Sequence, residues 1–192
     1  MNVLSASALG RISRTFDCNH NLLPREVEEM ERLGIPADAL AGPSPVRADY
    51  VVFDNLGFEF ECHTEVGKDG TRAFLFPVTD GHGVARDVVA WSPQLGKLAT
   101  WLGRAWALGE DTINAPRLSD HGALPVHRTP VGWLRARQRG ICLVRPQAAA
   151  HYLEAAGPLL AEDAEHGVEL KRLLTRPAPR ILVSVSTFKK AS

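Results

Sequence analysis

The chain has 192 residues, enough to bury a substantial core without metals or disulfides. Its 45% hydrophobic and 23% charged residues lie in the range of ordinary globular proteins, which argues against wholesale disorder. No stretch approaches the roughly 18 consecutive apolar residues that a bilayer span requires, so we expect no membrane segment.

Two features indicate the compartment. The first ten residues lack a basic segment ahead of an apolar one, which argues against secretion. The three cysteines, Cys18, Cys62 and Cys142, are odd in number and far apart, which argues against a disulfide framework. We therefore predict a cytoplasmic protein, and the abundance of Ala, Arg, Gly and Leu is typical of a bacterial coding sequence rich in G and C.

The net charge is zero, but the charges are unevenly spread. Residues 1–100 hold nine basic and fourteen acidic side chains, whereas residues 101–150 hold seven arginines and three acidic residues. Such asymmetry predicts a site for an anionic partner, unless the two regions pack together and cancel much of it.

A helical pattern comes first in the chain, over residues 23–40. Pro24 suits a first helical position, and Gly34 followed by Pro36 makes a stop. The run 41–45 contains two prolines and a glycine and is predicted to be a connector.

The middle of the chain, about 49–102, alternates apolar and polar residues with a period of two, which predicts an antiparallel meander. Short connections, including an Asp-Gly turn, favour hairpins. The predicted strands are 50–53, 58–63, 72–78, 85–91 and 98–102, although the last could also belong to a helix that starts at Ser92-Pro93.

The C-terminal third alternates helix and strand. Thr129-Pro130 caps a helix that ends at Gly140, and the predicted elements after it are strand 141–144, helices 147–156 and 162–174, and strand 181–185. The expected fold class is α+β, with helices packed on one mixed sheet. Residues 1–192 would form a single domain, with 1–45 as a helical N-terminal extension and 187–192 as a polar tail.

One face of the strand 58–63 carries Glu59, Glu61 and His63, which could together bind a divalent metal. The plainer interpretation is the polar outer face of a half-solvated sheet. The cysteines and histidines have poor spacing for zinc, and we expect no cofactor.

A second group of candidates precedes the Thr129 helix. Asp120, His121 and His127 flank a predicted loop, and histidine transfers protons near neutral pH. Neither a nucleophile elbow nor a zinc-protease motif nor a phosphate loop accompanies them.

The third group is basic and aromatic. Arginines with exposed aromatic rings can hold phosphates and stack on bases. Against this, cations in a last helical turn favour the helix dipole, and side chains two apart on a helix diverge by roughly 200°. The candidate binding residues are Arg128, Trp133, Arg135, Arg137, Arg139 and Arg145.

The leading hypothesis is a non-enzymatic binding or regulatory protein whose basic surface meets a protein or nucleic-acid partner. The alternative is a hydrolase that uses His121 or His127 with a carboxylate, or a metal at Glu59, Glu61 and His63. A homodimer, in which acidic and basic surfaces of two copies meet, is the third hypothesis.

Overall fold

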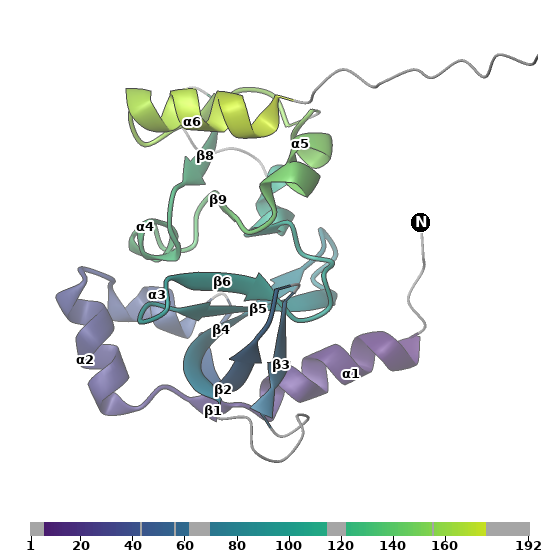
Figure 1. Cartoon of the computed structure of the whole chain (residues 1–192), viewed down its shortest axis with the longest axis vertical. Helices are drawn as coiled ribbons and strands as arrows, with labels where there is room; N and C mark the ends of the chain where they lie inside the picture. The colour runs from purple at the N-terminus through teal and green to yellow at the C-terminus, as the bar shows by residue number, and fades with distance from the viewer. Residues whose placement is uncertain are drawn as a thin grey trace, which may run out of the picture.

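The computed structural model describes residues 6–42, 44–55, 57–61, 70–114, 122–154 and 156–175. These residues form an α+β fold, as the sequence predicted, with a six-stranded antiparallel sheet and a separate four-stranded sheet. Figure 1 shows the larger sheet with helices α1, α2 and α3, and the smaller sheet with α5 and α6 on its far side.

The larger sheet confirms the strands predicted from the alternating pattern. Its order is β1-β2-β4-β5-β6, and β3 pairs with β2 beside this path. The segment 97–100 is a strand, which decides between the two predictions made for it. The strands are β1 (His20–Asn21), β2 (Arg47–Phe53), β3 (Phe58–Phe60), β4 (Thr71–Thr79), β5 (Ala85–Ser92) and β6 (Lys97–Thr100).

One neighbour relation in this sheet differs from a simple meander. β4 pairs with β2 and not with β3, which precedes it in the chain. Val51 lies opposite Phe60 on one side and Thr71 on the other. The strands β1 and β3 therefore lie beside different parts of β2, along the same edge.

Helices cover both faces of the larger sheet. Ile12 and Phe16 of α1 (Ala6–Asp17) pack with Val88 of β5 in one core. The sequence did not predict α1. On the other face, α2 (Pro24–Arg32) and α3 (Ala37–Ala41) divide the predicted 23–40 helix where Gly34 and Pro36 interrupt it.

The C-terminal strands form a sheet of their own instead of extending the first. Its order is β10-β8-β9-β7, with β8 parallel to both of its neighbours. Strand β8 is a correction to the sequence prediction, which placed a loop between His121 and His127. The strands are β7 (Ala107–Leu108), β8 (Leu124–His127), β9 (Ile141–Leu143) and β10 (Leu159–Leu160).

Three helices accompany the smaller sheet: α4 (Pro130–Arg135), α5 (Pro146–Leu153) and α6 (Ala164–Leu174). Thr129 caps α4 as predicted, because its hydroxyl oxygen accepts a hydrogen bond from Gly132 N at 3.2 Å. The predicted strand 181–185 and the tail 187–192 lie outside the described residues. No helix in the described part of the chain is long and apolar enough to cross a membrane.

Candidate functional site

The predicted metal site is only partly described. Phe58 and Phe60 are buried and Glu59 is exposed, as the alternation predicted. Glu59 accepts a hydrogen bond from the Trp101 indole at 3.3 Å, and Glu61 accepts one from Gly70 N at 3.3 Å. His63 lies outside the described residues. Within them, no group of three His, Cys, Asp or Glu side chains could hold a metal ion.

Of the predicted catalytic residues, Asp120 and His121 lie outside the described residues, and His127 ends strand β8. Its imidazole is 13% exposed, with Nε2 2.9 Å from the Arg139 carbonyl oxygen and Nδ1 3.4 Å from a Glu162 carboxylate oxygen. Both ring nitrogens therefore face an acceptor within the fold. This arrangement joins β8 to the segments that follow α4 and precede α6.

Three buried carboxylates, Glu26, Asp87 and Glu110, were missed by the sequence analysis. Asp87 is 0% exposed and accepts backbone N–H bonds of 2.7 to 2.9 Å from Val88, Leu102, Arg104 and Ala105. Its place inside an apolar strand was the signal that could have revealed it. Because four donors occupy its two oxygens, Asp87 holds the loop after β6 in place.

Glu110 plays a similar part beside the smaller sheet. It accepts hydrogen bonds from Trp106 N at 2.6 Å and from Arg86 at 2.9 Å. Burial raises the pKa of Glu110 above its ordinary value, although these donors act in the opposite direction. Both Asp87 and Glu110 thus serve the fold, through bonds to backbone and to one arginine.

Several of the predicted binding arginines contact other parts of the same chain. Arg135 donates to the Leu33 carbonyl at 2.7 Å, and Arg137 forms an ion pair with Asp38 at 2.8 Å. Gln138, between Arg137 and Arg139, donates to the carbonyls of Ala39 at 2.7 Å and Ser44 at 3.1 Å. These bonds hold the end of α4 against α2 and α3.

The other predicted binding residues are divided between core and surface. Trp133 is 5% exposed, donates from Nε1 to the Gly140 carbonyl at 3.0 Å and meets the Phe76 ring edge to face. Arg145 donates to the Gly103 carbonyl. The Arg139 side chain is exposed. The structure therefore does not bring Trp133 together with the arginines on one surface.

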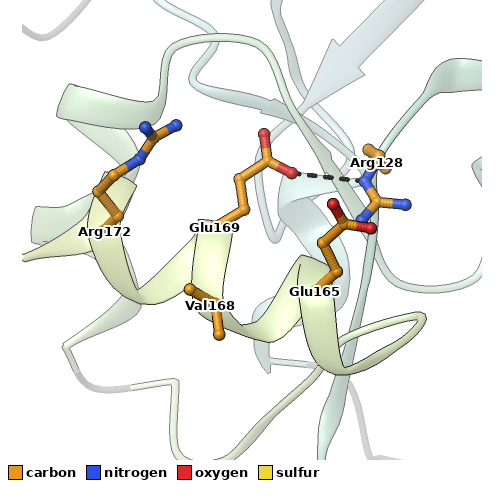
Figure 2. Close-up of a pocket in the computed structure, with 5 residues that line it drawn as sticks. All are labelled: Arg128, Glu165, Val168, Glu169 and Arg172. Atoms are coloured by element: carbon orange, nitrogen blue, oxygen red, sulfur yellow. Dashed lines mark hydrogen bonds and ion pairs between the residues drawn. The ribbon is translucent and has the colours of Figure 1, made fainter.

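Arg128 is the predicted binding residue that adjoins a depression. It follows β8 and extends over α6, where Nη1 and Nη2 each lie 3.3 Å from an Asp163 oxygen and Nε lies 3.4 Å from Glu169. Figure 2 shows the contact with Glu169. A hydrogen bond from His166 N, followed by that from Arg128, lowers the pKa of Asp163, which is also the N-cap of α6.

The depression has a volume of about 500 Å³ and is open to solvent. We call its lining the α6 surface, which consists of Arg128, Glu165, Val168, Glu169 and Arg172 (Figure 2). Val168 is 72% exposed, more than any other large hydrophobic side chain in the described residues. Within those residues, neither Glu165 nor Arg172 has a hydrogen-bond or ion-pair partner.

Comparison with known proteins identifies no relative. No model of a protein family matches the chain, and neither does any curated protein or any solved structure.

Proposed function

We propose that this protein is a non-catalytic binding protein that recognises another polypeptide through the α6 surface. The observation that carries the proposal is the combination at this surface of a highly exposed Val168 with unpaired charges of both signs. Protein interfaces combine apolar side chains with polar and charged ones around them. Elsewhere, His127, Asp87, Glu110, Arg135 and Arg137 are engaged in bonds that hold the fold together.

The mixture of charges favours a polypeptide over a nucleic acid. Arg128 and Arg172 share the lining of the depression with Glu165 and Glu169, so phosphates would meet carboxylates as often as guanidinium groups. No aromatic side chain that the structure describes lines the depression, and Trp91, Trp106 and Trp133 are buried, so bases would find no ring to stack on at the α6 surface. A polypeptide, which carries both signs of charge and apolar side chains, matches this surface better.

Site-specific photo-crosslinking tests the proposal. A photoreactive p-benzoylphenylalanine replaces Val168 in one variant and, as the matched control, Leu95 in another; Leu95 is 50% exposed but lies in the turn between β5 and β6. Illumination of cells that express each variant should give a discrete protein adduct at 168 and none at 95. The adduct at 168 should disappear when Glu165 and Glu169 are both replaced by lysine.

Equal labelling at the two positions, or an adduct at 168 that survives the charge reversals, would contradict the proposal. Retention on heparin at low and raised salt tests the nucleic-acid alternative in parallel. We expect elution at low salt, because the arginines Arg128, Arg135 and Arg137 are paired within the chain. Strong, salt-sensitive retention would favour the polyanion partner instead.

A further inference from the structure

The charges of Glu165 and Arg172 on α6 are complementary to those of a second α6 helix that runs in the opposite direction. Building on the proposed function, we infer that the polypeptide bound there is a second copy of this chain, with the two α6 helices packed antiparallel about a twofold axis. The axis would pass between residues 168 and 169, and Glu165 of each copy would face Arg172 of the other.

The buried residues of α6 show which side of the helix faces outward. His166 and Leu170 are buried and define its inner side. At about 100° per residue, the positions opposite them are Glu165, Val168 and Arg172, three and seven residues along the helix from the first. These three side chains, which we call the stripe, therefore lie on the outward half of α6, where Val168 and the two charged residues are exposed.

The order of charges along the stripe gives the symmetry. Glu165 precedes the midpoint between residues 168 and 169 by the same number of residues as Arg172 follows it. In an antiparallel pair of identical helices, positions equidistant from the axis face each other. Each Glu165 then faces the Arg172 of the other copy, so the dimer contains two identical ion pairs. The two Val168 side chains lie near the axis between them.

Glu165 and Arg172 of the same chain cannot form an ion pair with each other. Seven residues of helix separate their Cα atoms by roughly 10 Å along the axis, too far for a direct ion pair between side chains on the same stripe. A parallel arrangement of two copies would bring like charges together. The antiparallel dimer is the arrangement that pairs both residues.

The neighbouring charges do not oppose this contact. Glu169 lies next to the axis, but it is already paired with Arg128 of its own chain at 3.4 Å. The four charged residues of the α6 surface sum to zero, so two copies do not repel each other through it. Lys171 is exposed and lies three residues after Val168, on the side of Val168 opposite to Glu165.

Sedimentation velocity over a range of protein concentrations tests the inference with the full chain. A stripe on one short helix buries little area, so we expect a weak dimer that dissociates on dilution. Glu165→Arg alone and Arg172→Glu alone should each weaken dimerisation by roughly tenfold or more, because each change turns both ion pairs into repulsive contacts.

A mixture of the two single variants tests directly whether residues 165 and 172 face each other in the dimer. An equimolar mixture of the two single variants should form a heterodimer, since both contacts between positions 165 and 172 then again join an arginine to a glutamate. The double variant E165R/R172E should dimerise like the unaltered chain. Controls with the same changes in charge are Glu28→Arg on α2 and Arg11→Glu on α1, both at exposed positions remote from α6, which should leave the dimer unchanged. Circular dichroism of each variant checks that it folds.

A chain that stays monomeric at every concentration would overturn the inference, as would single variants that dimerise normally or a mixture that fails to restore the dimer. The crosslink at position 168 separates this failure from failure of the proposed function. An adduct with twice the mass of the chain supports the dimer. An adduct of another mass contradicts the dimer but leaves polypeptide binding at the α6 surface in place.

Discussion

Arg72 on β4 donates from Nε and Nη2 to the two carboxylate oxygens of Glu26 on α2, at 2.8 and 3.2 Å. One of these oxygens also accepts a hydrogen bond from Leu23 N at 2.7 Å, at the start of the helix. Burial acts to raise the pKa of Glu26, but these donors outweigh it and the pKa lies below its ordinary value. The pair joins α2 to the sheet, 46 residues away in the chain.

Glu26→Gln should lower the free energy of unfolding by about 1–3 kcal/mol, because a partly buried Arg72 loses its counter-charge. Since the folded pKa is depressed, the stabilisation is present above the ordinary glutamate pKa and is lost as the pH falls through the folded pKa. Urea titrations of both proteins between about pH 3 and pH 7 should thus show a difference that grows with pH. Glu28→Gln, an exposed control on the same helix, should show almost no difference.

Glu110 should give the opposite dependence on pH. Burial raises its pKa in the folded state, so its favourable contribution is present below the ordinary glutamate pKa and declines as the pH rises through the folded pKa. The stability of the unaltered chain relative to Glu110→Gln should therefore fall between about pH 4 and pH 7. A difference that rises with pH, as for Glu26, would refute this account of Glu110.

Gly109 should tolerate alanine poorly. Its φ is +73°, and a Cβ there would lie 2.3 Å from the Gly140 carbonyl oxygen, a backbone atom. Gly83 has φ +74° but open space around it, so Gly83→Ala measures the conformational strain without the collision. Thermal and chemical unfolding should give a loss of about 1 kcal/mol for Gly83→Ala and of about 3 kcal/mol or more for Gly109→Ala. Equal losses of unfolding free energy in the two variants would mean that the backbone shifts to relieve the collision at Gly109 without destabilising the protein.

Cys142 should resist alkylation in the native protein. Burial, with a smaller effect of nearby Glu162, raises the pKa of its thiol to about 12, and the thiolate is the reactive form. With iodoacetamide near neutral pH, peptide mass spectrometry should show labelling of the exposed Cys18 but not of Cys142 until the protein is unfolded. Rapid native labelling of Cys142 would show that β9 opens more readily than its burial implies.

Local sequence patterns were sufficient to predict several helices and strands. The alternation of Phe58, Glu59 and Phe60 predicted both the strand and its buried side, and Thr129-Pro130 predicted the start of α4. In each case the determining interaction is local, either the period of the backbone or a cap within one turn. The helix α1 was missed although its residues form an amphipathic pattern, with Ile12 and Phe16 on the side that packs against the sheet.

The candidate site was predictable only in part. Arg128 was selected because of its basic neighbourhood, and it does adjoin the α6 surface. Its significance, however, depends on Glu169, 41 residues later in the chain, and on a helix whose outward stripe is visible only once His166 and Leu170 are known to be buried. Composition had suggested a basic surface, whereas the acidic side chains of α6 make it mixed.

By itself, the sequence determined the fold class, the strands of the larger sheet and the capped α4 helix, because periodicity and capping act over a few residues. The tertiary structure alone decided that β4 pairs with β2, that the C-terminal strands form a second sheet, and which charges remain unpaired. Arg135 and Arg137 meet partners 102 and 99 residues away. Such encounters depend on how whole elements pack, and no local pattern of residues encodes them.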